Sequence, residues 1–240
     1  MPKPFTEWTV LPHGKLSRLD DNLLSVTGDI HMPVADFPRR MTVIRLRSGK
    51  LVIYSAIALD EAEMNALEDF GEPAFLIVPN DIHRLDAKIW KDRYPQLSVI
   101  SPAGVRKKVE AVVPVDSTTA DFDDPRVQYV TVPGTEEHEA ALVVKTWSGT
   151  TLVVSDLIWN LEDRPGFGGW LFRVMGFTGG EPRIPTVVEL RAIKDKNALR
   201  DQLEAWARIG DLNRIIVSHG AIVTRDPSGV LVHLAQTLAA

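Results

Sequence analysis

Short apolar runs rich in β-branched residues alternate with amphipathic segments in both halves of this 240-residue chain, and this alternation constrains the fold more than any other feature. The run at residues 74–78 is apolar throughout, which is typical of a strand covered on both faces. In all, strands are predicted at residues 23–26, 42–46, 51–54, 74–78, 97–100, 127–132, 140–145, 151–155 and 214–218.

Three helices are predicted between these strands from apolar residues at helical spacing. The first follows Asp60, a suitable N-cap, and ends at Gly71; the second ends at Tyr94; the third runs from Asp195 to Gly210. Strands in both halves with helices between them predict an α/β protein in which two sheets pack together under covering helices. No internal repeat or low-complexity linker divides the chain, so residues 1–240 are expected to form one domain.

Composition excludes several classes of function. The chain contains no cysteine, which removes disulfides, thiolate metal ligands, iron–sulfur clusters and cysteine nucleophiles. A net charge of −5 gives no general attraction to nucleic acid or anionic lipid, and no apolar run is long enough to span a bilayer. The start of the sequence lacks the apolar core of a signal peptide, so a cytoplasmic location is expected.

Two further segments have open interpretations. The basic run 106–108 is interpreted as a solvated helix face rather than a phosphate-binding patch. Residues 164–180 contain six glycines among apolar side chains, which fits either a lid over a pocket or an irregular packed excursion.

Histidines and aspartates gather where predicted strands begin or end. Taken singly, each such residue is most simply a cap or a solvated side chain. Together they point to a shared site, because side chains at strand ends meet in one crevice of an α/β sheet, and imidazole and carboxylate are ligands for zinc, iron or manganese. The candidate ligands are Asp81, His83 and Asp86 after the strand 74–78, His138 before 140–145, Asp156 directly after 151–155 and His219 directly after 214–218.

The order of these residues resembles that of the metallo-β-lactamase superfamily. Within it, the chain is most similar to a bacterial family of uncharacterised proteins, the DUF4336 type, through the segments 40–51, 79–83, 151–157 and 218–220. The resemblance covers roughly residues 20 to 225. It implies a four-layer αβ/βα sandwich.

The resemblance also implies which residues hold metal. The superfamily motif His-x-His-x-Asp-His falls on residues 81–86, where His83 keeps its type, Asp81 and Asp86 replace histidines, and Leu85 replaces the aspartate of the second metal. A placement that begins one residue earlier, at Asn80, retains none of the motif's ligands. The next ligand falls on Glu137 by strand register, with His138 one residue away. The bridging aspartate falls on Asp156 and the final histidine on His219.

Two functions follow from this degenerate motif. In the first, one divalent metal (zinc, iron or manganese) activates water against an ester, lactone, amide or phosphoester of an unidentified small molecule, and Asp156 is the catalytic residue that binds the metal or orients the water. The loss of the aspartate replaced by Leu85 argues against a two-metal centre. In the second, the chain is a structural or ligand-binding relative without metal. Close carboxylates without a cation would repel one another, which favours the first interpretation.

Overall fold

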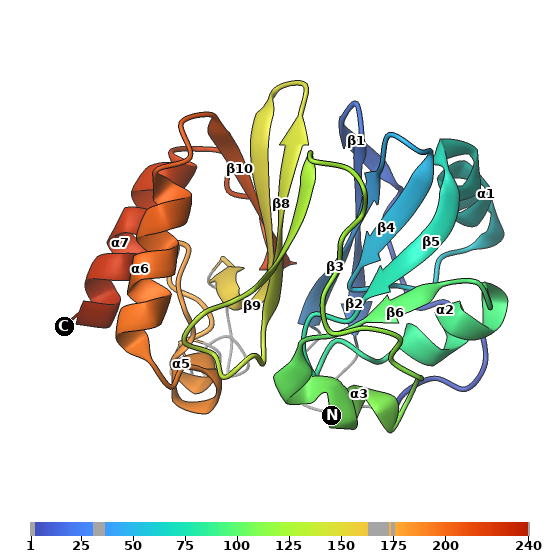
Figure 1. The fold of residues 1–240 in the computed structure, drawn as a ribbon, viewed down its shortest axis with the longest axis horizontal. Helices are drawn as coiled ribbons and strands as arrows, with labels where there is room; N and C mark the ends of the chain where they lie inside the picture. The colour runs from blue at the N-terminus through green and yellow to red at the C-terminus, as the bar shows by residue number, and fades with distance from the viewer. Residues whose placement is uncertain (1–2, 31–36, 163–172, 174–175, 240) are drawn as a thin grey trace.

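Two β-sheets packed face to face and covered by helices on their outer sides form the fold (Figure 1). It is seen in a computed structural model, which describes residues 3–30, 37–162, 173 and 176–239. The layers run helices, sheet, sheet, helices, so the predicted four-layer α/β sandwich is confirmed. Most of the glycine-rich segment 164–180 lies outside the described residues, and the question of a lid there is left open.

The first sheet has six strands in the order β1-β2-β3-β4-β5-β6. Pairing is antiparallel from β1 to β4 and parallel from β4 to β6. The strands are β1 (Ser17–Asp20), β2 (Leu23–Ile30), β3 (Phe37–Arg45), β4 (Lys50–Tyr54), β5 (Glu72–Ile77) and β6 (Ser98–Ile100). Its helices are α1 (Glu61–Phe70), α2 (Ala87–Arg93) and α3 (Arg106–Glu110), the last preceded by the 3₁₀ turn Ala103–Val105.

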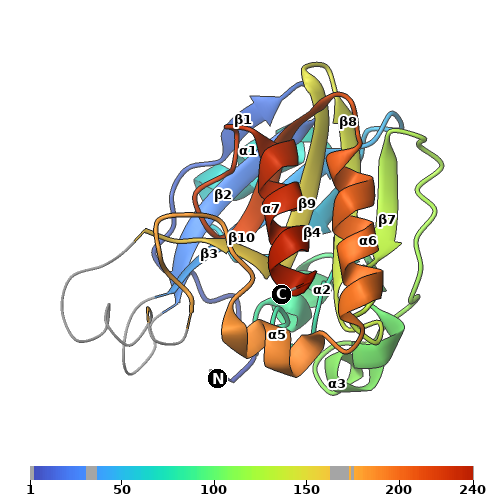
Figure 2. The same ribbon diagram turned by 90° about the vertical axis from the view of Figure 1, so that its left-hand side faces the viewer.

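The second sheet has four strands in the order β10-β9-β8-β7, with only the β10–β9 pair parallel. The strands are β7 (Val127–Thr131), β8 (Ala140–Thr146), β9 (Gly149–Asn160) and β10 (Leu212–Gly220). Helices α6 (Lys196–Ala207) and α7 (Pro227–Ala239) lie side by side across its outer face (Figure 2). Helix α5 (Thr186–Ala192) lies near α3 at one end of the sandwich (Figure 1).

Local capping signals place the two longest predicted helices correctly. The Asp60 side chain accepts a hydrogen bond from the Glu63 amide at the start of α1, and Asp195 does the same for the Ala198 amide in α6. These bonds satisfy amides that have no partner within the helix. Helix α7 begins with the same signal, because Asp226 Oδ1 accepts a hydrogen bond from the Gly229 amide at 3.0 Å, yet it was not predicted. Strand β1 and helix α5 carried no such signal and were not predicted either.

Strand β9 differs from its prediction in a way that matters for the site. It extends to Asn160, so Asp156 lies inside the strand rather than directly after it. Val217 of β10 pairs with Val154, but His219 pairs with Trp159, so β10 advances two residues (217 to 219) while β9 advances five (154 to 159). This irregularity in pairing lets β9 project a side chain out of the regular ladder, as β-bulges near active sites do.

Apolar side chains from both sheets fill the space between them. Ile44, Val52 and Tyr54 of the first sheet belong to the same buried cluster as Leu142 and Ile216 of the second. Separate apolar clusters lie under the helices on each side. Burial of these surfaces stabilises the sandwich and holds the two sheets at a defined separation.

Arg40 of β3 is a buried polar link between the sheets. Its guanidinium donates to the backbone oxygens of Val217 (3.0 Å) and Gly220 (2.7 Å) in β10 and to Ser25 Oγ (3.1 Å) in β2. Burial lowers the pKa of Arg40 below its ordinary value. Since these bonds flank residue 219, they help position that part of β10 against the first sheet.

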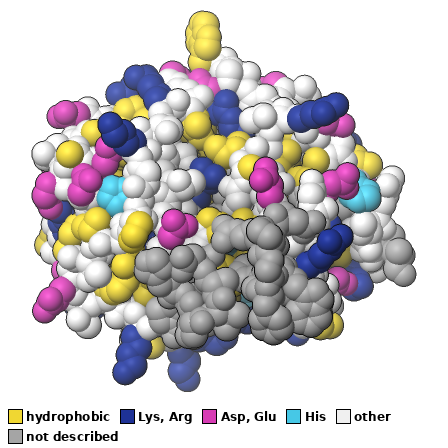
Figure 3. Space-filling view, turned by 180° about the vertical axis from the view of Figure 1, so that it is seen from behind, with side chains coloured by type: hydrophobic (Ala, Val, Ile, Leu, Met, Phe, Trp, Pro, Cys, Tyr) yellow, Lys and Arg dark blue, Asp and Glu magenta, His cyan; other side chains and the backbone are white. Residues whose placement is uncertain are grey.

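The outer surface mixes charges of both signs. Figure 3 shows acidic and basic side chains scattered among apolar ones over the face that it draws. None of the helices in the described part of the chain combines the length and apolar character that a membrane-spanning segment needs.

Arg40→Met tests the link between the sheets. We expect the free energy of unfolding to fall by about 3 kcal/mol, because the substitution leaves buried carbonyl groups without a donor. Urea denaturation followed by circular dichroism measures the change. The control is Arg47→Met, whose side chain is 65% exposed and lies 3.9 Å from Asp124; it should change stability by less than about 1 kcal/mol. Equal stabilities of the two variants would show that Arg40 does not stabilise the packing of the two sheets.

Candidate metal centre

His83 is carried by a turn that Asn80 organises. The turn follows β5, and Asn80 Oδ1 accepts hydrogen bonds from the backbone amides of Ile82 (2.9 Å) and His83 (3.0 Å). Asparagine favours this kind of turn because its side chain can satisfy amides two or three residues ahead. The Nδ1 atom of His83 lies 2.6 Å from Ser55 Oγ, just after β4, so the ring is held from two neighbouring strands.

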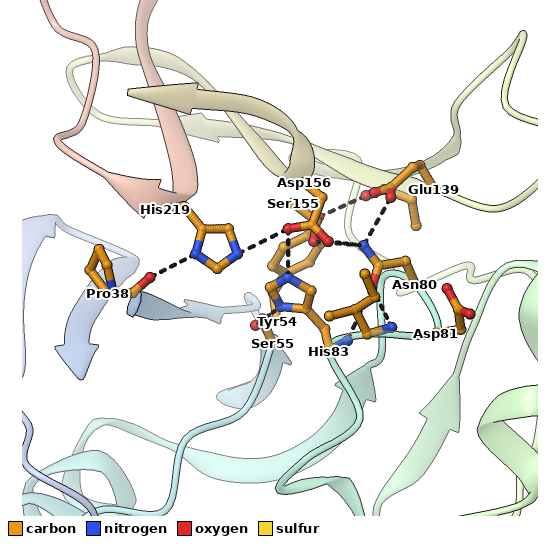
Figure 4. A network of polar contacts seen from close by, with 12 residues as sticks. Pro38, Tyr54, Ser55, Asn80, Asp81, His83, Glu139, Ser155, Asp156 and His219 are labelled. Atoms are coloured by element: carbon orange, nitrogen blue, oxygen red, sulfur yellow. Dashed lines mark hydrogen bonds and ion pairs between the residues drawn. The ribbon is translucent and has the colours of Figure 1, made fainter. Parts of the chain in front are cut away.

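Asp156 projects from the irregular part of β9 toward two histidines (Figure 4). Its Oδ1 lies 3.1 Å from His83 Nε2 and 2.9 Å from His219 Nε2. Its Oδ2 accepts a hydrogen bond from Asn80 Nδ2 at 2.9 Å. Burial acts to raise the pKa of Asp156, but His83 and His219 outweigh it and hold the pKa well below its ordinary value. The charged form of this buried carboxylate is therefore the stable one.

His219 joins the two sheets at the same point. Its Nδ1 lies 2.6 Å from the backbone oxygen of Pro38 in β3, while its Nε2 faces Asp156. Its ring stacks on that of Trp159, its partner in the β9–β10 pairing, with 4.1 Å between centroids. Hydrogen bonding at one nitrogen and stacking on the ring together fix where the other nitrogen points.

Glu139 is buried beside this cluster. Asn80 Nδ2 donates to its Oε1 at 2.9 Å, and Oε2 has no hydrogen-bond partner among the described residues. Burial, assisted by the negative charge of Asp156, raises the pKa of Glu139 well above its ordinary value. The neutral acid is thus favoured next to a charged carboxylate, as is usual when two carboxyl groups share a site.

A cavity of about 320 Å³ opens beside these side chains. Its volume is at the lower end of the range of roughly 300–1,000 Å³ found for small-molecule pockets. Asn80, Glu139, Asp156 and His219 line it together with apolar and basic side chains of β3, β9, α3 and α5. The cluster is therefore accessible to a small molecule.

Three of the six residues predicted as metal ligands come together: His83, Asp156 and His219. One ligand atom from each lies within 4.8 Å of the other two. They come from three separate strand ends or bulges, so the prediction that polar side chains converge at one edge of the sheets agrees with the geometry.

The other three predicted ligands have different partners. Asp81 binds Lys108 (2.9 Å) and Arg191 (2.8 Å), and these cations, against the effect of burial, lower its pKa. His138 turns its Nδ1 toward the backbone oxygen of Thr135 at 2.9 Å. Glu137, the alternative to His138, is exposed. The buried acidic side chain near Asp156 is instead that of Glu139, so neither Glu137 nor His138 takes the predicted ligand position.

Asp86 is also engaged away from the cluster. Its carboxylate pairs with buried Arg39 and accepts a hydrogen bond from the Ala58 amide at 3.0 Å. Burial raises the pKa of Asp86 above its ordinary value even though Arg39 acts in the opposite direction. Removing one partner of such a buried pair leaves the other charge unpaired, so the role of Asp86 is structural. Its contacts, like those of Asp81 and His138, do not support metal ligation.

The converging donors fit a divalent cation. Two imidazole nitrogens and one carboxylate oxygen form a set found in catalytic zinc and non-haem iron sites. His219 provides the structural test, because a carbonyl oxygen can only accept and Nδ1 must therefore carry the hydrogen. In the neutral ring, Nε2 then presents a lone pair to a carboxylate oxygen 2.9 Å away. A cation or a second proton between these two acceptors removes the repulsion.

Asn80, Glu139 and Ser55 belong to the site but were not predicted as part of it. In the sequence analysis, Asn80 was considered only as the first residue of an alternative placement of the metal-binding motif. Its position two residues before Ile82 and three before His83, directly after a proline, is the signal of a side-chain-capped turn. Glu139 is the last residue of an acidic run and carries no signal that separates it from its exposed neighbours.

Known proteins resemble this chain in structure rather than in sequence. No protein-family model matches it, and no curated protein matches it in sequence. The metallo-β-lactamase DIM-1, solved after exposure to ceftazidime, aligns over 97% of this chain and 100% of its own, with a TM-score of 0.64 and 12% identity. FIM-1 from Pseudomonas aeruginosa, in its mono-zinc form, aligns over 95% and 96%, with a TM-score of 0.62 and 13% identity.

A metallo-β-lactamase from Hirschia baltica aligns over 93% of this chain and 98% of its own, with a TM-score of 0.59 and 12% identity. Similarity at this level of identity concerns the fold and does not by itself carry an activity. The three alignments cover 93–97% of this chain, with TM-scores of 0.59 to 0.64. The chain has the metallo-β-lactamase fold.

Proposed function

We propose that this protein is a metal-dependent hydrolase that binds one divalent cation through His83, Asp156 and His219. The observation that carries the proposal is the convergence of these three donors, with the Nε2 atoms of both histidines directed at the same carboxylate oxygen (Figure 4). A cation in such a site supplies a Lewis acid and lowers the pKa of water toward neutrality. The cavity beside the donors gives a substrate access to them.

The surrounding residues hold the donors in place. Pro38 and Ser55 fix the rings of His219 and His83 from their Nδ1 sides, which leaves both Nε2 atoms toward the centre. Asn80 holds the second oxygen of Asp156 and also the turn that carries His83. Partners of this kind set the orientation of metal ligands, and their loss typically lowers metal affinity about 10- to 100-fold.

Proton transfer falls to Glu139 in this proposal. It lines the same cavity, its neutral form is favoured, and its Oε2 has no partner among the described residues. A buried carboxylic acid with a raised pKa is suited to donate a proton to a leaving group. The alkoxide or amine that leaves when an ester, lactone, amide or phosphoester bond breaks takes up a proton, which such a donor supplies.

A single cation agrees best with the partners of the remaining acidic residues. Asp81 and Asp86 are each paired with arginine, and Leu85 stands where the superfamily motif has an aspartate. FIM-1, one of the similar structures, is described in a mono-zinc form. The alternative is a relative without metal, in which His83, Asp156 and His219 only link the strand ends. The DUF4336-type resemblance and the cytoplasmic location remain predictions.

Metal analysis separates these alternatives. We expect protein purified without chelator, or loaded with zinc and desalted, to hold about one metal ion per chain by inductively coupled plasma mass spectrometry. His219→Ala and Asp156→Ala should remove it, because each deletes a donor. His138→Ala is the matched control, since this histidine lines the cavity but turns its Nδ1 to Thr135, and it should keep the metal. Wild-type protein that stays metal-free after loading would contradict the proposal.

Asn80→Ala tests the positioning residue. We expect zinc affinity to fall roughly 10- to 100-fold, because both Asp156 and the turn before His83 lose a hydrogen-bond partner. Competition with a chromogenic chelator measures the affinity. Asn213→Ala removes a comparable side-chain bond, 2.7 Å from the Ser148 oxygen at the far hairpin, and should leave zinc affinity unchanged. Equal affinity in Asn80→Ala and the wild type would show that Asn80 does not position the donors.

A further inference from the structure

We infer that the substrate of this site is a compact acyl compound, with an apolar acyl group on one side of the hydrolysable bond and an oxyanion such as a carboxylate on the other. N-acyl amino acids are the simplest compounds of this kind. The inference deepens the proposed hydrolase function and rests on it for the reaction. The recognition itself depends on side chains other than the three metal donors.

The apolar side of the cavity is a wall of aromatic rings. Trp159 stacks on Phe177 with 4.5 Å between ring centroids, and Phe37 meets Trp159 edge-on at 6.1 Å. All three residues line the cavity, and Trp159 also stacks on the metal-site residue His219 at 4.1 Å. An apolar group placed against these rings would therefore lie directly beside the donors. Burial of such a group is favourable because it removes apolar surface from water.

The other side of the cavity is basic. Lys108 of α3 and Arg191 of α5 reach Asp81 from the helices of two different layers, at 2.9 and 2.8 Å. Arg84 lines the same side, donates to the backbone oxygen of Lys108, and pairs with no carboxylate of the described residues. Three cations against one carboxylate leave an excess of positive charge at this side. Arginine and lysine side chains so arranged bind carboxylates and phosphates.

The remaining acidic groups of the cavity do not cancel this charge. Asp156 faces the two histidines, and the neutral form of Glu139 is favoured. An incoming oxyanion thus meets Lys108, Arg191 and Arg84 without a competing free carboxylate in the described lining. The basic run 106–108 is exposed, as a solvated helix face should be, and Lys108 of this run also lines the cavity whereas Lys107 does not.

The donors lie between the two sides. Asp81 precedes His83 by two residues in the same turn, whereas Trp159 lies against His219. A molecule that contacts both sides therefore places its central bond at the metal donors. Because a water molecule takes about 30 Å³ in the liquid, a cavity of about 320 Å³ holds on the order of ten non-hydrogen atoms. That volume favours a short acyl chain.

Calorimetric titration of the metal-free full chain tests recognition apart from chemistry. The probe is N-hexanoylglycine, compared with N-acetylglycine, which lacks the long apolar group, and with the neutral amide of N-hexanoylglycine. We expect N-hexanoylglycine to bind with a millimolar or lower Kd and each comparison compound to bind at least about tenfold more weakly. Added salt should weaken the binding of the acid more than that of the amide.

Charge-removing variants locate the anion. Arg191→Gln and Lys108→Gln should each weaken binding of N-hexanoylglycine several-fold and leave the neutral amide unaffected. Lys107→Gln removes the same charge from an exposed neighbour that does not line the cavity, and as the matched control it should bind like the wild type. Equal binding of acid and amide, equal binding in all three variants, or no binding of the acid would overturn the inference.

Zinc loading distinguishes this inference from the proposed function. Zinc uptake without binding of N-hexanoylglycine would overturn the substrate class and leave the metal-dependent hydrolase in place. Binding of N-hexanoylglycine with no zinc uptake would overturn the hydrolase, and with it the assignment of this compound class as substrates. Zinc uptake together with binding of the acid supports both, and hydrolysis of N-hexanoylglycine by the zinc-loaded chain is then expected to release glycine and hexanoate.

Discussion

The buried carboxylate of Asp156 is the interaction on which the rest of the site depends. It lies where the two sheets meet, and it contacts His83 from the first sheet's side and His219 from β10. A buried charge of this kind is stable only with partners: Asn80 donates one hydrogen bond, and a proton or cation shared with the two imidazoles supplies the rest. The inter-sheet bonds of Arg40 to β10 and of His219 to Pro38 keep those partners in register. Fold stability and site geometry are therefore coupled.

Local signals in the sequence predicted much of the fold. The caps Asp60 and Asp195 and the apolar runs of the central strands depend on neighbours close in the chain, and they placed α1, α6 and the sheets. Helix α7 carries the same kind of cap at Asp226 but was not predicted, and strand β1, which has no cap signal, is held by its antiparallel pairing with β2. The irregular pairing of β9 was also unpredictable, because it arises from the mismatch with β10 rather than from the residues of β9 alone.

The candidate site was predictable in outline but not residue by residue. Residue type and strand ends correctly pointed to His83, Asp156 and His219 as neighbours. They could not show that Asp86 forms an ion pair with Arg39, or that Asp81 forms ion pairs with Arg191 and Lys108, since these partners lie far away in sequence. Glu139 shows the same limit. Only the start of β8 decides which residue of the acidic run 136–139 faces inward.

The central claim is that two histidines and one aspartate hold a cation between the sheets. X-ray absorption spectroscopy at the zinc edge, on protein loaded with one equivalent of zinc, tests it most directly. The account predicts a first shell with two imidazole nitrogens and one carboxylate oxygen at about 2.0–2.2 Å, and the loss of one imidazole in His219→Ala. A shell made of oxygen alone, or a spectrum unchanged by that substitution, would contradict it.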